Sequence, residues 1–120
     1  MSFQGYDTGL ISNGTSLSSG IPLGGRVPYN VVLPAAWTAA NVSFQVSVDG
    51  SYYGSLFNDD GTEYTATNTY TLASSGVGRA IAIDGTKFAG ANYVKIQSGT
   101  QAAPVAQGAD RTVQLGMRDL

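Results

Sequence analysis

Cysteine and histidine are both missing from this sequence, and charged side chains are scarce. Without cysteine the chain has no disulfide, no thiolate metal ligand and no cysteine nucleophile. Without histidine it lacks the commonest general base and the commonest transition-metal ligand. Charged residues make up 12% of the chain, about half the usual share, and the net charge is −2. These absences argue against most enzymes, and the missing basic surface argues against a nucleic-acid partner.

Helix-forming and membrane-spanning patterns are missing as well. The chain has one Glu and two Lys, the residues on which helical surfaces rely. No apolar run approaches the roughly 20 residues of a membrane helix, so we expect no membrane partner. The N-terminus lacks the basic region and the apolar stretch of a signal peptide, which predicts an unprocessed product made in a cytoplasm.

The residues that are abundant favour strands and turns. The chain has 16 Gly and 7 Tyr, with many Ser and Thr. From Asn41 to Val48, apolar residues occupy every even position, which predicts a half-buried strand. Asp49-Gly50 then predicts a tight hairpin turn into a partner strand over 52–57. Asn58–Gly61 predicts another turn, followed by a strand region over 62–71.

Other segments repeat this pattern of short strands. We expect strands over 26–33, 79–83, 92–98 and 112–117, with shorter ones between residues 9 and 25. Pro28 cannot donate to a strand ladder, so it predicts an edge or a bulge. The one candidate helical turn lies at 34–40, with Trp37 as an apolar plug. Roughly seven to nine strands, with turns every 8–12 residues, predict an all-β, antiparallel β-sandwich of jelly-roll type.

The predicted organisation is a flexible N-terminal arm over residues 1–8 and a single β-sandwich domain over residues 9–120. The predicted core collects the apolar side chains expected on inward strand positions. It comprises Ile11, Leu17, Ile21, Val32, Trp37, Val42, Phe44, Val46, Leu56, Ile81, Ile83, Phe88, Val94, Ile96, Val113 and Leu115.

The search for catalytic groups gives weak candidates. Asp59, Asp60 and Glu63 suit a Ca²⁺ loop or a carboxylate pair, but the same residues also suit a turn in which Asp caps backbone amides. A Ser–Lys pair would need Lys87 or Lys95 buried beside a serine, and the alternation places Lys95 on a polar strand face. We therefore predict no enzyme, no cofactor and no metal.

Aromatic residues are the remaining candidates for a binding surface. Tyr52 and Tyr53 must point to opposite faces of a strand, so one of them should be exposed. Core packing, a protein interface and a sugar-stacking platform are the three interpretations. Strand faces built from uncharged polar residues favour the interface, because no ion must be desolvated there. The predicted interface residues are Phe3, Tyr6, Tyr29, Tyr52, Tyr53, Tyr70 and Tyr93.

Several stretches resemble a family of small proteins encoded in tailed-phage and prophage genomes, often near head genes. The stretches are Ile11-Ser12-Asn13-Gly14-Thr15-Ser16-Leu17-Ser18, Leu33-Pro34-Ala35-Ala36-Trp37-Thr38-Ala39-Ala40, Phe44-Gln45-Val46-Ser47-Val48-Asp49-Gly50, Tyr93-Val94-Lys95-Ile96-Gln97-Ser98-Gly99-Thr100 and Ala109-Asp110-Arg111-Thr112. Residues 42–57 are also similar to the discoidin-like, galactose-binding type of jelly roll.

The resemblance implies a bacteriophage virion structural protein. The expected role is a capsid decoration or cement protein that binds the major capsid protein on the outer capsid surface and stabilises the shell, with self-association or a symmetric arrangement there. One alternative is a glycan-binding adhesion module on the virion, with Tyr52 or Tyr53 and the loops around Asp59 and Gln101 lining a groove. The other is a tail- or fibre-associated structural protein.

Overall fold

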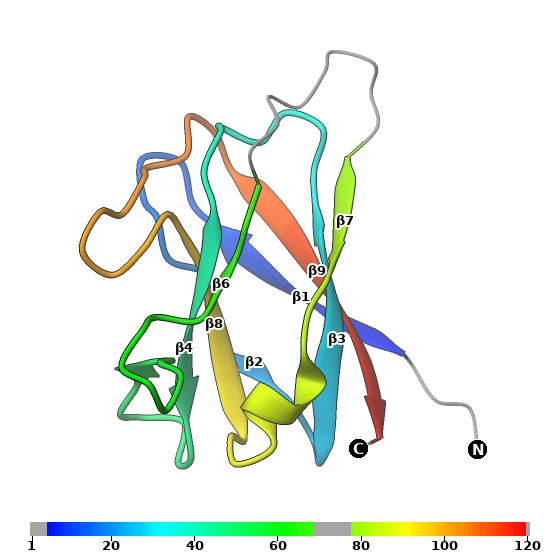
Figure 1. Ribbon diagram of the computed structural model, residues 1–120. Helices are drawn as coiled ribbons and strands as arrows, with labels where there is room; N and C mark the ends of the chain where they lie inside the picture. The colour runs from blue at the N-terminus through cyan, green and yellow to red at the C-terminus, as the bar shows by residue number, and fades with distance from the viewer. Residues whose placement is uncertain (1–4, 69–77, 120) are drawn as a thin grey trace.

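Two antiparallel sheets face each other in the computed structural model, which describes residues 5–68 and 78–119 (Figure 1). Sheet A has the order β1 (Tyr6–Ile11), β9 (Arg111–Asp119), β3 (Arg26–Leu33) and β7 (Arg79–Ala82). Sheet B has the order β2 (Ile21–Pro22), β8 (Tyr93–Ser98), β4 (Val42–Ser47) and β5 (Gly54–Ser55), and β6 (Thr65–Ala66) also pairs with β4.

The strand order is that of a jelly roll. Both β5 and β6 pair with β4, at its two ends, and so form one interrupted edge strand. Counted in this way, the first strand pairs with the last, the second with the last but one, and so on inward. This nested antiparallel pairing defines the double-sheet jelly roll, so the predicted fold class is confirmed.

The core lies between the sheets and follows the alternation of the sequence. In sheet B, Phe44 pairs with Ile96, and both side chains are fully buried. The Phe44 ring meets the Phe88 ring edge-on, with 5.1 Å between centroids. In sheet A, Val113, Leu115 and Met117 are fully buried, as the alternation of 112–117 predicts. Trp37 is buried at the turn after β3, and its indole N–H donates to the Ala40 carbonyl.

Two predicted core positions are wrong. Leu17 is half-buried, lies outside the core cluster and forms an isolated bridge with Gln97. Val32 is half-buried and faces outward, whereas Val31 and Leu33 are fully buried. The cause is a β-bulge between Pro28 and Asn30, which shifts the alternation along β3. The bulge at Pro28 is itself one of the two outcomes that the proline predicted.

The predicted boundary at residue 8 also needs correction. Tyr6–Ile11 forms β1, which pairs with β9 from Tyr6↔Gly116 to Ile11↔Arg111. The Met117 N–H donates to the Gly5 carbonyl at 2.7 Å, which extends this pairing by one residue. The part of the expected arm from Tyr6 onward is therefore strand. Residues 1–4, with Phe3, lie outside the described residues.

The loops differ in length from the sequence expectation. The predicted Asp49-Gly50 turn lies inside a longer connection, because β5 begins only at Gly54. The predicted turn at 58–61 is present, with Gly61 N–H donating to the Asn58 carbonyl. Of the predicted strand region over 62–71, the structure describes β6 and nothing beyond residue 68.

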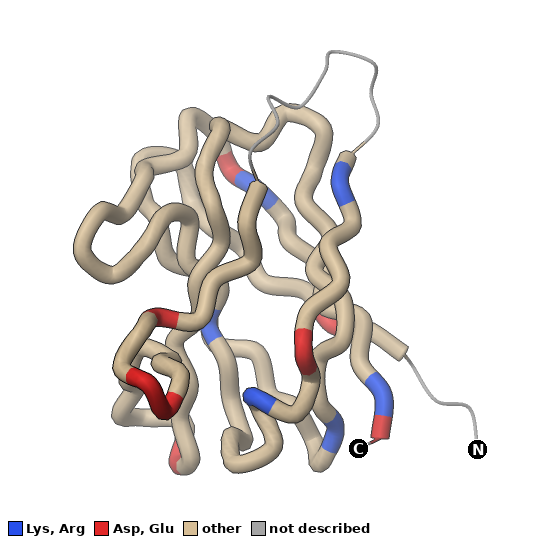
Figure 2. The backbone as a smooth tube through the Cα atoms, in the orientation of Figure 1, with Lys and Arg blue, Asp and Glu red and all other residues tan. Residues whose placement is uncertain are grey.

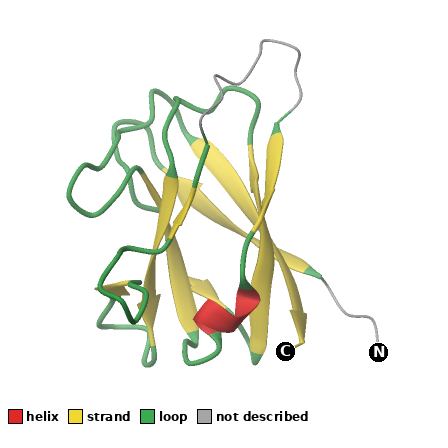
Figure 3. Cartoon of the chain, in the orientation of Figure 1, coloured by secondary structure: helices red, strands yellow, loops and turns green. Residues whose placement is uncertain are grey.

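The helical structure described is the 3₁₀ turn η1 (Gly85–Phe88) (Figure 3). No helix in the described ranges is long and apolar enough to cross a bilayer.

Candidate partner-binding face

The outer face of sheet A carries no charged residue at its centre. The strand register places Tyr6, Gly116, Asn30 and Ala82 in one row across the four strands. The next row holds Thr8, Gln114, Val32 and Ala80, and a third begins with Leu10 and Thr112. We call these ten residues the neutral face. Figure 2 shows that the charged positions of β3, β7 and β9 lie toward the strand ends.

The neutral face is open to solvent. Tyr6 is 47% exposed and Leu10 is 43% exposed. The side chains of Thr8, Thr112 and Gln114 are exposed, and none of the three makes a hydrogen bond within the described part of the chain. Their donors and acceptors are therefore available to a partner, and no ionic group must be desolvated to reach them.

Two hollows mark opposite ends of this face. Gly5, Tyr29, Asn30, Gly116 and Arg118 line one hollow, with a volume of about 280 Å³. Asn30 Oδ1 is buried there without a hydrogen-bond partner.

The second hollow lies toward the opposite ends of the same strands. Its volume is about 230 Å³, and it is lined by Val32, Leu33, Pro34, Thr112 and Gln114. Three of these five residues belong to the neutral face. The face therefore offers a recess at each end into which side chains of a partner would fit.

Sheet B uses its outward side chains within the molecule. The Ser43 hydroxyl donates to the Gly99 carbonyl at 2.8 Å, and Ser43 is fully buried. The Ser47 hydroxyl accepts from the Gly50 N–H at 2.8 Å. Lys95 holds its ammonium group 4.4 Å from the centre of the Tyr53 ring, so it is not paired with a serine. Loops of the chain therefore cover Ser43 and Ser47 on this face.

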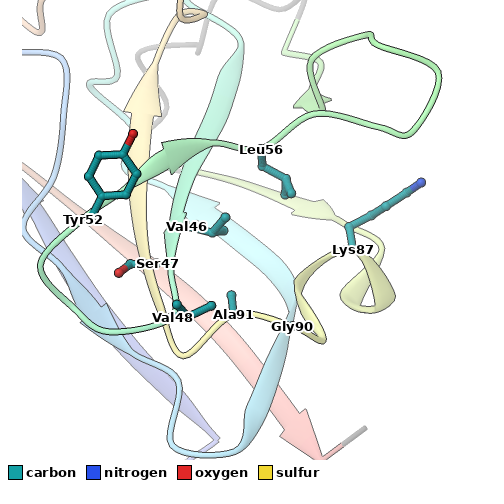
Figure 4. Close-up of a pocket in the computed structure, with 8 residues that line it drawn as sticks. All are labelled: Val46, Ser47, Val48, Tyr52, Leu56, Lys87, Gly90 and Ala91. Atoms are coloured by element: carbon teal, nitrogen blue, oxygen red, sulfur yellow. The ribbon is translucent and has the colours of Figure 1, made fainter.

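An apolar pocket opens at one end of the sandwich (Figure 4). Its volume is about 350 Å³, and Val46, Val48 and Leu56 supply much of its lining. Tyr52, 82% exposed, and Lys87 lie on opposite sides of it. The pocket is a second candidate site.

The predicted interface tyrosines do not form one cluster. Tyr6 belongs to the neutral face and Tyr29 to its rim, whereas Tyr52 lies at the apolar pocket. Tyr53 is stacked under Lys95, and Tyr93 lies against Gly50 at the same end of sheet B. Phe3 and Tyr70 lie outside the described residues. The expectation that one of Tyr52 and Tyr53 is exposed is confirmed by Tyr52.

Sequence reasoning missed the polar half of the neutral face. Thr112 and Gln114 alternate with buried Val113 and Leu115, and this alternation was the available signal. Asn30 had no such signal, because the bulge at Pro28 hides its orientation.

The acidic residues act as caps of turns. Asp60 accepts from both the hydroxyl and the N–H of Thr62, and these contacts hold its pKa below the ordinary carboxyl value. A Thr86 hydroxyl lowers the pKa of Asp84 in the same way. Glu63 accepts from the Gln101 N–H, which joins the loops around Asp59 and Gln101. No group of three acidic, His or Cys residues that would hold a metal occurs among the residues described.

Two further groups at the end of sheet B have shifted pKa values. The backbone N–H groups of Tyr52 and Ser51 donate to Asp49 and keep its pKa below the ordinary carboxyl value. Burial raises the pKa of Tyr53. Neither shift creates an acid–base pair, because each group is held by its own local contacts.

Comparison with protein-family models, curated proteins and solved structures found no match.

Proposed function

We propose that this chain is a structural protein of a tailed-phage virion that decorates the outer capsid surface. Its partner is the major capsid protein, and the neutral face is the surface that binds it. The observation that carries the proposal is an exposed four-stranded face without a central charge, on which the Thr8, Thr112 and Gln114 side chains make no hydrogen bond within the described residues. The resemblance to small phage proteins supplies the context.

The face alone is smaller than a standard protein interface. With strands about 4.8 Å apart and about 3.3 Å per residue, its ten residues have a projected area of roughly 300 Å². A specific interface buries about 800 Å² on each partner. The rim residues Tyr29 and Arg118 would supply part of the difference. A single copy therefore binds weakly, and many copies on a symmetric shell together add stability.

A charge placed in the centre of the face tests the proposal. Gln114→Lys puts an ammonium group where a partner would have to desolvate it. The matched control is Gln101→Lys, which makes the same change on an exposed loop beside sheet B. Each variant is mixed with capsid shells that lack this protein, and the bound fraction is measured by co-sedimentation.

We expect Gln114→Lys to weaken binding by about tenfold or more, and Gln101→Lys to bind like the unaltered protein. Equal binding of the two variants would exclude the neutral face as the docking surface. Recovery of the protein only in the unassembled fraction of infected cells would exclude a virion role. Recovery on tails or fibres would instead support the alternative location.

Glycan binding remains the second candidate because Tyr52 is almost fully exposed beside a pocket. An aromatic ring at the mouth of a pocket is suited to stacking on a sugar. Binding on a glycan array that disappears in Tyr52→Ala would favour this function. An array without signal would exclude it.

A further inference from the structure

The lateral edges of the two sheets are not equally protected. An edge strand with unpaired backbone groups is a template for another strand, and proteins usually block such edges. On β1, the outward N–H of Thr8 donates to Asp7 Oδ1, and Leu10 exchanges bonds with Ser19. On β2, Pro22 has no N–H to offer.

The opposite edge of sheet B is blocked by its irregularity. Its edge consists of β5 and β6, each two residues long, with the loop from Phe57 to Glu63 between them. No continuous row of backbone groups is available there. Three of the four edges are therefore protected by side chains, by proline or by interruption.

The fourth edge, β7, has none of these devices at its centre. Ile83 N–H donates to the Tyr29 carbonyl, and the register continues through Ile81↔Val31. In an antiparallel pair the bonded residues alternate, so Ala80 and Ala82 point their N–H and C=O groups away from β3. Among the described hydrogen bonds, none engages these outward groups. The stretch ends at Asp84, whose N–H is taken by the Tyr64 hydroxyl.

We propose that β7 pairs with β7 of a second copy of this chain, antiparallel, about a two-fold axis through Ile81. Ala80 then faces Ala82 of the second copy, and each such pair exchanges two backbone hydrogen bonds. The two copies of Ile81 face each other as a non-bonded pair. Sheet A thereby continues from one copy into the next, and the two neutral faces form one surface.

The side chains of β7 fit this arrangement. The sequence Ala80-Ile81-Ala82 is symmetric about Ile81, as a two-fold interface requires. Ile81 packs on the core but is only half-buried, and its counterpart would cover the remaining surface. Arg79 comes opposite Ile83 of the second copy, so no like charges meet.

This pairing is independent of what the neutral face binds. It is short, and the area it buries lies below the roughly 1,000 Å² of a stable interface. We therefore expect weak association in dilute solution, strengthened wherever many copies are held side by side.

Because the chain has no cysteine, one engineered thiol reports the register. In a non-bonded antiparallel pair the Cα atoms are about 4.5 Å apart, which is within disulfide range, so Ile81→Cys should cross-link two copies. The matched control is Ala82→Cys. Two copies of residue 82 would be roughly 8 Å apart and outside that range. An equimolar mixture of Ala80→Cys and Ala82→Cys tests the same register at exposed positions.

The variants are oxidised mildly at high protein concentration, and the disulfide dimer is quantified on non-reducing gels. We expect Ile81→Cys to cross-link about tenfold faster than Ala82→Cys, and the mixture to give mainly heterodimer. Adding Ala82→Pro to Ile81→Cys removes an outward N–H. The cross-linking rate of this double variant should fall to that of Ala82→Cys. Equal rates for all variants, or rates unaffected by the proline, would overturn the pairing. That result would leave the proposed binding of the neutral face to a capsid shell standing.

Discussion

The outer faces of the two sheets contrast in how they use the same kinds of residue. Both present mainly uncharged polar side chains, and Lys95 is the charged residue at the centre of the sheet B face. On sheet B, Ser43 and Ser47 are bonded to the chain's own loops and are buried. On sheet A, Thr112 and Gln114 are exposed and have no such bond in the described structure. Loops therefore bury polar side chains on the outer face of sheet B, whereas the polar side chains of the neutral face on sheet A stay open to solvent.

The contrast arises from the loops. The connection after β4 folds back onto Ser47, and the chain after β8 turns at Gly99 to cover Ser43. Gly99 has a φ of +88°, and a Cβ there would lie 2.5 Å from the Ala103 carbonyl oxygen. Only glycine fits this turn. On sheet A, no loop within residues 5–68 and 78–119 bonds to the Thr8, Thr112 or Gln114 side chain.

The largest expected effect comes from removing a side chain beneath the outer face of sheet B. Phe44 is fully buried and packs against the Phe88 and Tyr64 rings. Phe44→Ala should lower the free energy of unfolding by about 3–5 kcal/mol. The control, Gln114→Ala on the open face, should change it by less than about 0.5 kcal/mol. Urea denaturation measures both. A comparable loss in the control would mean that the open face is part of the fold's stability.

A smaller loss is expected for a polar residue that ties the loops to the sheets. Gln107 is buried and bonds to both the N–H and the C=O of Thr38, to the Ser98 hydroxyl and to Arg111 Nε. Gln107→Leu keeps the size of the side chain but leaves these groups unpaired.

We expect Gln107→Leu to lose about 2–3 kcal/mol of stability, measured by thermal or urea unfolding. The exposed Gln101→Leu serves as control and should be close to neutral. If Gln107→Leu were as stable as the control, the hydrogen bonds of the Gln107 amide would not stabilise the 99–109 loop.

The sequence predicts the contrast only in part, for physical reasons. Alternation is a local signal, so it correctly predicts β4, β8 and the buried residues of β9. It fails at Val32, where one bulge reverses inside and outside. Alternation does not predict the role of Gln107, because three of the groups to which Gln107 bonds belong to Thr38 and Ser98. Only folding brings these two residues close to Gln107. Which sheet has its outer polar side chains covered depends on such loop contacts, and these contacts produce no periodic pattern in the sequence.

The smallest expected effect is a pH dependence of stability that arises from carboxylates outside the neutral face. Asp49 and Asp60 lie in loops beside sheet B, Asp84 precedes η1, and hydrogen bonds lower the pKa of all three. A carboxylate whose pKa is lower in the folded than in the unfolded state stabilises the fold at pH values above the unfolded pKa. That contribution disappears as the pH falls through the folded pKa.

Stability should therefore be constant from about pH 5 to 8 and decline below about pH 4. Asp49→Asn should flatten part of this decline, because the amide cannot gain a proton. Urea midpoints across this pH range measure it, with Asp119→Asn, at the far end of β9, as the control. Binding through the neutral face contains no titrating group at its centre, so shell binding between pH 5 and 8 should not change. If shell binding changed with pH and had its midpoint in that range, an ionisable group would lie in the contact. That outcome would contradict an uncharged docking face.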